Sequence, residues 1–191
     1  EGLVDPDKHK ALNEHYYRQY QQGQLDIDEY LSFALGPMAG MTPETLSALQ
    51  DKFLKKHVEP ILLDAAFDLL QAHRVNGDTL IIITATNTLV TQPIADRLGV
   101  EHLIGCEAEL KDGRYTGKPE GVPSFGEGKV QRIKTWCTEH QILFEDAVFY
   151  SDSHNDLPLL RKVARAIAVD PDDLLRVEAQ QCGWEIISLR L

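Results

Sequence analysis

Two aspartates that follow an apolar segment are the residues of this sequence best placed to do chemistry. The segment Ala147–Tyr150 contains only apolar and aromatic residues, which predicts a fully buried strand. Asp152 and Asp156 come in the polar run directly after it, and Pro158 suits the first turn of a following helix. Polar residues after a buried strand are typical of active-site loops in α/β sheets. We therefore expect both carboxylates to face one small volume, where a hard cation would relieve their mutual repulsion.

The same polar run has a plainer interpretation. Asp, Asn and Ser are common turn formers, and Asn155 or Asp156 can cap the next helix without any catalytic role. The choice between an active-site loop and a simple turn depends on the rest of the chain.

Thr84 and Lys129 lie at comparable places earlier in the chain. Thr84 follows the strand-like run Leu80–Ile83, where its hydroxyl and the free amides of the next turn can hold a phosphate oxygen. Lys129 follows Gly126–Gly128 near a helix start, where the helix dipole disfavours a cation, so a negatively charged partner is expected. Taken singly, Thr84 also fits an ordinary hydroxyl at the end of a strand, and Lys129 also fits a solvated surface lysine. Together with the carboxylates, they favour phosphoryl transfer, which depends on positioning and charge neutralisation.

At this point the chain resembles a known family. The segments Ile82–Asn87, Gly126–Val130 and Tyr150–Pro158 are similar, in order and spacing, to the second, third and fourth motifs of the haloacid dehalogenase superfamily. The closest resemblance is to its subfamily IB, the phosphoserine-phosphatase-like branch, and it extends over the whole chain. It implies a Mg²⁺-dependent phosphomonoester hydrolase that acts on a small soluble phosphorylated metabolite through an aspartyl-phosphate.

The resemblance also implies roles for individual residues. Thr84 and the amide of Ala85 would bind the transferring phosphoryl group, and Lys129 would neutralise it. Asp152 would bind Mg²⁺ and Asp156 would support the metal site, while Asn155 would hydrogen-bond phosphate or substrate. One or two carboxylates, phosphate oxygens and waters are the ligands that Mg²⁺ prefers.

The first motif of the family, an apolar strand that ends in Asp-x-Asp, has no counterpart here. The Asp-x-Asp at Asp26–Asp28 follows a polar run and reads as a helix cap. Because the first Asp of that motif is the nucleophile, we expect the chain as given to be inactive. We also expect the natural protein to have further N-terminal residues, since the chain begins with Glu1 and not Met. The alternative is a natural, catalytically dead relic that binds a ligand or a partner.

The order of elements predicts an α/β fold with a small all-helical cap. Helix starts at Asp5, Asp26 and Thr42 predict helices throughout residues 1–58, the cap, whose aromatic and Leu positions are expected to pack in a core. Strands and helices then alternate over residues 59–191, which predicts a Rossmann-like parallel sheet that lacks the family's first strand. A hairpin turn is expected at Lys111–Arg114.

Composition narrows the function classes. The 191 residues carry a net charge of −11, which disfavours nucleic acid as a partner, and no apolar run approaches a membrane span. No glycine-rich fingerprint or Walker lysine motif indicates a nucleotide-binding module. The cysteines show no metal-ligand spacing and are expected to be reduced, in a cytoplasmic protein. These cysteines are Cys106, Cys137 and Cys182. The sequence assigns no role to four other polar residues, which are Arg18, Lys52, His57 and His154.

Overall fold

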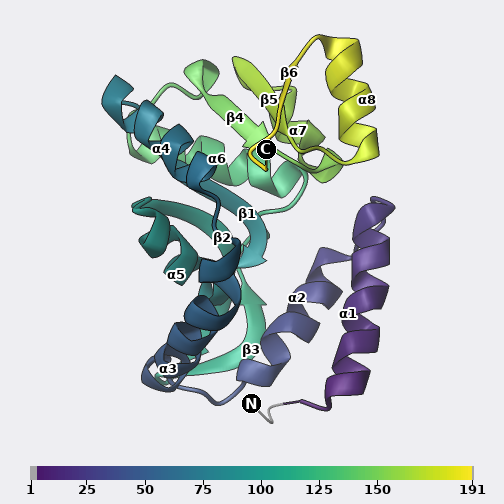
Figure 1. Ribbon diagram of the computed structural model, residues 1–191. Helices are drawn as coiled ribbons and strands as arrows, with labels where there is room; N and C mark the ends of the chain where they lie inside the picture. The colour runs from purple at the N-terminus through teal and green to yellow at the C-terminus, as the bar shows by residue number, and fades with distance from the viewer. Residues whose placement is uncertain (1–3, 191) are drawn as a thin grey trace.

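The computed structural model describes residues 4–190, which form an α/β fold (Figure 1). The helices are α1 (Pro6–Gln21), α2 (Ile27–Leu35), α3 (Pro43–Phe53), α4 (Asp64–Asn76), α5 (Thr88–Leu98), α6 (Glu127–Glu139), α7 (Leu157–Leu160) and α8 (Asp173–Cys182), with short turns η1 (Gly36–Met38), η2 (Leu54–Val58), η3 (Glu59–Ile61), η4 (Phe144–Asp146) and η5 (His154–Asp156). The strands are β1 (Ile81–Asn87), β2 (His102–Lys111), β3 (Arg114–Glu120), β4 (Val148–Ser151), β5 (Arg165–Val169) and β6 (Glu185–Ile187). Within residues 4–190, no helix combines the length and the apolar composition that a bilayer crossing requires.

The strands form two three-stranded sheets. In the first, β1 runs parallel to β2, and β2 turns back into antiparallel β3 at the expected hairpin. In the second, β4, β5 and β6 are all parallel. The predicted α/β fold with parallel strands is confirmed, but one continuous sheet is not formed. Strands β1 and β4 each have a paired strand on one side only within the described residues.

The prediction of a fully buried strand at 147–150 is wrong. Val148 is 39% exposed, and Phe149 and Tyr150 are only partly buried. The three isoleucines of β1 are likewise partly buried. A strand stays partly exposed along an edge that no other strand covers, and within residues 4–190 β1 and β4 each pair with a strand on one side only.

Helix α6 holds the two sheets together. Its residues Val130, Ile133 and Cys137 form one core cluster with Ile104 of β2 and Leu159 of α7. Side chains of both open-edged strands pack against this cluster, namely Ile81 and Ile83 of β1 and Phe149 of β4. The first residues of α6 are therefore held between the carboxyl ends of β1 and β4.

The N-terminal helices begin where expected. The side chains of Asp5, Asp26 and Thr42 accept hydrogen bonds from the first free amides of α1, α2 and α3. The fully buried Leu31 and Leu35 of α2 fix this region against β2, β3 and α5. Helix α1 differs, because it contributes no buried residue and stands at the edge of the molecule (Figure 1).

Two boundaries differ from the sequence prediction. The amphipathic pattern of residues 61–73 predicts a helix over that range, but α4 begins three residues later, at Asp64, because η3 ends at Ile61 and the backbone of Leu62 and Leu63 is extended. The glycines and prolines of residues 118–128 predict a loop, but β3 continues to Glu120 because Glu107 and Ala108 of β2 pair with Glu120 and Pro119.

Candidate active site

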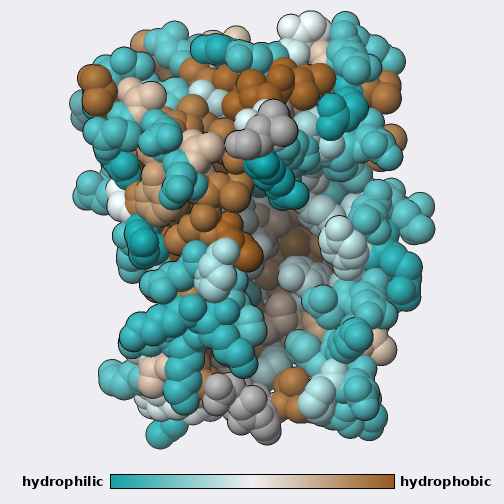
Figure 2. All heavy atoms as spheres, viewed as in Figure 1, coloured by the Kyte–Doolittle hydropathy of each residue, from teal (hydrophilic) through white to brown (hydrophobic). Residues whose placement is uncertain are grey.

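A cavity of about 370 Å³ brings the predicted site residues together. Thr84, Ala85, Lys129, Asp152 and Asp156 all contribute to its lining. Helices α1 and α2 form the opposite wall, and Figure 2 shows the hollow between these helices and the body of the molecule. The ends of β1 and β4 therefore point into one shared cavity, as expected for the carboxyl ends of parallel strands.

A bulge in β1 places Thr84 and Ala85. Ile83 of β1 pairs with Ile104 of β2, and the next pair is Asn87 with Cys106. Three residues of β1 therefore lie opposite one residue of β2, and residues 84–86 bulge out of the ladder. Within the bulge, the amide of Thr86 donates a hydrogen bond to the Thr84 hydroxyl at 3.1 Å.

The buried thiol of Cys106 supports this bulge. Its Sγ donates to the carbonyl of Ala85 at 3.2 Å and accepts from the amide of Ser124 at 3.2 Å. Burial raises the pKa of Cys106, which keeps the thiol protonated and able to donate. The sequence predicted a reduced thiol at Cys106 but not its hydrogen bonds to Ala85 and Ser124, because these contacts depend on strand register.

Lys129 is buried, with 4% of its surface exposed. Its Nζ forms an ion pair with Asp156 Oδ1 and lies 5.8 Å from the centre of the Phe149 ring. The interpretation of Lys129 as a solvated surface lysine is therefore wrong. The helix start that carries it needs Gly128, since a Cβ at that position would collide with the carbonyl of Pro123.

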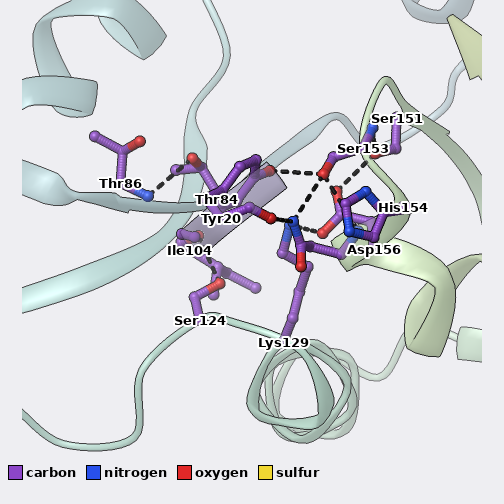
Figure 3. A network of polar contacts seen from close by, with 12 residues as sticks. Tyr20, Thr84, Thr86, Ile104, Ser124, Lys129, Ser151, Ser153, His154 and Asp156 are labelled. Atoms are coloured by element: carbon purple, nitrogen blue, oxygen red, sulfur yellow. Dashed lines mark hydrogen bonds and ion pairs between the residues drawn. The ribbon is translucent and has the colours of Figure 1, made fainter. Parts of the chain in front are cut away.

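Asp156 is held on both carboxylate oxygens. Lys129 binds Oδ1, and the hydroxyl of Ser151 donates to Oδ2 at 2.7 Å (Figure 3). Asp156 therefore fixes the position of the Lys129 side chain in the cavity.

Asp152 is the carboxylate that remains available to a ligand. It lines the cavity, and among residues 4–190 no side chain hydrogen-bonds to its carboxylate. Desolvation, together with the negative charges of Asp156 and Asp172, raises the pKa of Asp152. A divalent cation would relieve this destabilisation of the charged form. The described residues include no group of three or more His, Cys, Asp or Glu side chains arranged around a metal position, so a metal here would also need phosphate oxygens and waters, as Mg²⁺ does.

The loop after β4 is also attached to helix α1. The Tyr20 hydroxyl donates to Ser153 Oγ at 2.7 Å (Figure 3). Nδ2 of Asn155 donates to the Tyr20 carbonyl at 3.0 Å. Asn155 is not among the residues that line the cavity. Its predicted contact with phosphate stays a prediction, while its observed contact joins helix α1 to the loop after β4.

The remaining polar residues lie elsewhere. His154 donates its amide to Asp172 Oδ2 and holds the same oxygen through Nδ1, each at 2.8 Å. His57 packs its ring on Phe53. Neither histidine lines the cavity, and neither do the cap cations Arg18 and Lys52.

Two expectations for the helical region have opposite outcomes. Asp26 caps α2 by accepting hydrogen bonds from Asp28 and Glu29 at 3.0 and 3.1 Å, as predicted. The expectation that the aromatic residues pack in a core is wrong for Tyr16, Tyr17 and Tyr20, which line the cavity. Sequence spacing alone does not say whether a helix face meets a core or an open site.

Comparisons with known proteins show the family of the chain. The model of the haloacid dehalogenase-like hydrolases matches residues 3–161. The chain belongs to this family. A histidinol-phosphatase of Neisseria meningitidis is 39% identical over 99% of the chain and 87% of its own length. A phosphoserine phosphatase of Mycobacterium tuberculosis is 33% identical over 83% of the chain, and the chain spans about half of that relative (51%).

Solved structures of this family have the same fold. A Bordetella pertussis protein of unknown function superposes with a TM-score of 0.89 at 40% identity, covering 97% of the chain and 84% of that protein. A phosphoserine phosphatase in a phospho-aspartyl intermediate analogue form superposes with a TM-score of 0.67 at 17% identity, covering 93% and 79%. The second likeness supports the fold alone.

Proposed function

We propose that this chain forms most of a Mg²⁺-dependent phosphomonoesterase for a small phosphorylated metabolite. The observation that supports it best is the buried Lys129 in a cavity shared with Asp152 and the Thr84–Ala85 bulge. Burying a lysine is costly unless an anion accompanies it. Here the cation is fixed by Asp156 on one side and faces the cavity, where a phosphoryl group would be stabilised.

The chain's own residues would bind and orient the phosphoryl group. The Thr84 hydroxyl and the Ala85 amide would hold two of its oxygens, and Lys129 would neutralise the charge. Asp152 would hold Mg²⁺, which supplies further positive charge beside the phosphoryl group when it is bound.

A nucleophile is the part that residues 4–190 do not supply. The aspartates that line the cavity within these residues are Asp152 and Asp156, and both come from one loop. The open edges of β1 and β4, with partly buried apolar residues on both, would accept one extended strand between them. We infer that such a strand, from outside these residues, presents an aspartate to the cavity. Its carboxylate would attack phosphorus as the alcohol leaves, and water would then hydrolyse the acyl phosphate.

A second candidate function follows from the lack of a nucleophile among residues 4–190. Without a nucleophile, the cavity would bind a phosphate ester and leave it intact. This binding protein would be stabilised against heat by phosphate with no turnover.

The test compares residues 1–191 with the longer product, if any, that the gene encodes. We expect the protein with the added strand to release phosphate from p-nitrophenyl phosphate with Mg²⁺ and to lose this activity in EDTA. Asp152→Asn should lower kcat/KM by about a hundredfold or more, while Asp68→Asn, on the exposed surface of α4, should leave it unchanged. Phosphate binding without hydrolysis in every form of the protein would instead establish the binding function.

The names of the two relatives point to different alcohols in the substrate ester. Histidinol phosphate is the ester of an amino alcohol with a ring, whereas phosphoserine carries a carboxylate. Both esters fit the proposed phosphomonoesterase and belong in the same assay.

A further inference from the structure

Two histidines lie together at the end of the first sheet that faces away from the cavity. His102 is the first residue of β2 and pairs with Ile81, the first residue of β1, whereas the cavity lies at the carboxyl end of β1. His140 is the C-cap of α6, and about 16 Å along the helix axis separates it from Lys129 in the first turn. The pair is therefore a feature separate from the phosphoryl site.

The rings of both histidines pack on Trp136. The ring of His140 stacks on the indole, with ring centres 3.9 Å apart and planes 16° from parallel. The ring of His102 lies 4.9 Å from the same indole, and the centres of the two imidazoles are 5.5 Å apart. Helix α6 and strand β2 are fixed against each other in the core, where Ile133 packs with Ile104. The two imidazoles are thus carried on rigid elements.

A hydrogen bond sets the tautomer of His140. Its Nδ1 lies 2.9 Å from the carbonyl oxygen of Trp136. Because a carbonyl only accepts, Nδ1 carries the proton, and Nε2 has a free lone pair whenever the ring is neutral. Histidines that bind metals almost always donate their other ring N–H in this way. The ring of His102 makes no hydrogen bond or ion pair with residues 4–190, so a nitrogen of this ring is available as well.

The spacing of the two rings suits one shared metal ion. With metal–nitrogen distances of about 2.1 Å, two imidazoles on a tetrahedral ion have ring centres about 5.3 Å apart. The observed separation is 5.5 Å. His140 is exposed and His102 is partly exposed, so water can reach the ion. Each histidine directly follows an exposed glutamate, Glu101 or Glu139, and this negative charge favours a cation.

We propose that His102 and His140 together bind one divalent transition-metal ion of the class of Zn²⁺, and that this ion ties the start of β2 to the end of α6. Imidazole nitrogens suit Zn²⁺, Ni²⁺ and Cu²⁺, whereas Mg²⁺ prefers oxygen ligands. No group of three metal-binding side chains occurs within residues 4–190, so waters complete the coordination shell. The site does not depend on the proposed phosphomonoesterase function, because it stabilises the fold and binds no phosphate.

The fluorescence of Trp136 tests the proposal. The protein has two tryptophans, so Trp184→Phe leaves Trp136 as the only indole. In the presence of excess Mg²⁺, the open-shell ion Ni²⁺ should quench this fluorescence until the site is saturated. Zn²⁺, which has a filled d shell, should compete with Ni²⁺ and restore the signal. An absence of quenching, or quenching that Zn²⁺ does not reverse, would overturn the proposal.

His102→Gln and His140→Gln, each made with Trp184→Phe, distinguish a shared ion from two separate contacts. Removing either ligand of a shared ion should weaken Ni²⁺ binding by at least about tenfold, because the second contact is no longer intramolecular. If the remaining histidine kept the parent affinity with a smaller amplitude of quenching, the proposal would be wrong. The matched control is His57→Gln, which changes a histidine that packs on Phe53 and should leave Ni²⁺ affinity unchanged.

Thermal unfolding gives a second measurement. Zn²⁺ at a hundred times its dissociation constant should raise the Tm of the parent protein by roughly 5–10 °C, because the two ligands come together only in the folded chain. His140→Gln, a change at an exposed residue, should keep the metal-free Tm within a few degrees and lose the increase with Zn²⁺. An equal increase in both proteins would mean that Zn²⁺ binds elsewhere and would refute the site.

Discussion

Replacing Lys129 by methionine should destabilise the fold much more than a similar change on the surface. The side chains of Lys129 and Asp156 are 5% and 15% exposed, so the ion pair is almost completely removed from water. Removing one partner of a buried pair costs about 3–5 kcal/mol, because the other charge stays buried and unpaired. Ser151 still donates to Asp156 at 2.7 Å, which offsets part of this cost. We therefore expect a loss near the lower end of that range, about 3 kcal/mol.

The matched control is Lys162→Met. Lys162 pairs with Glu127 at 2.8 Å, but the two side chains are 39% and 74% exposed. An exposed pair of this kind contributes less than about 1 kcal/mol. Urea unfolding followed by circular dichroism measures both variants against the parent. In thermal unfolding, a loss of 3 kcal/mol corresponds to a decrease of roughly 6–12 °C in Tm for a domain of this size.

A double variant tests the cause. Lys129→Met combined with Asp156→Asn leaves no unpaired charge, and the amide oxygen still accepts from Ser151. The double variant should be more stable than Lys129→Met alone. If Lys129→Met lost no more stability than Lys162→Met, the pair would be solvated, and the argument that a buried cation marks the phosphoryl site would fail.

Three further predictions follow from single contacts. Tyr20→Phe removes the hydroxyl that donates to Ser153, and it should lower the free energy of unfolding in urea by about 1 kcal/mol. Amide hydrogen exchange in α1 should become faster. Unchanged exchange would mean that this contact does not hold the helix. Gly128→Ala, where a Cβ meets a backbone carbonyl, should destabilise by about 1–3 kcal/mol, whereas Gly36→Ala, where a Cβ meets nothing within 4 Å, should be neutral or slightly stabilising. Burial alone raises the pKa of Asp172, but hydrogen bonds from backbone amides and the His154 imidazole make this pKa lower than usual. The contribution of Asp172 to stability is therefore present above the ordinary Asp pKa of about 3.9 and is lost as the pH falls through the lower folded value. Asp172→Asn should lose stability at neutral pH, and its difference from the parent should shrink as the pH falls through that folded value; a difference that does not depend on pH would refute this sign.

Local signals in the sequence determined much of the framework. Asp5, Asp26 and Thr42 cap helices because their side chains reach amides only two or three residues ahead. The β-branched run before Thr84 likewise predicted β1. These features depend on residue type and on neighbours within about one helical turn, so the chain specifies them before any tertiary contact forms.

Only the tertiary structure decided how these parts act together. The pairing of Lys129 with Asp156 crosses 27 residues, and that of Tyr20 with Ser153 crosses 133. The sequence could not show that Lys129 is buried or that the tyrosines of α1 face a cavity. Burial and strand pairing depend on which surfaces meet, and that is settled by contacts between segments far apart in the chain.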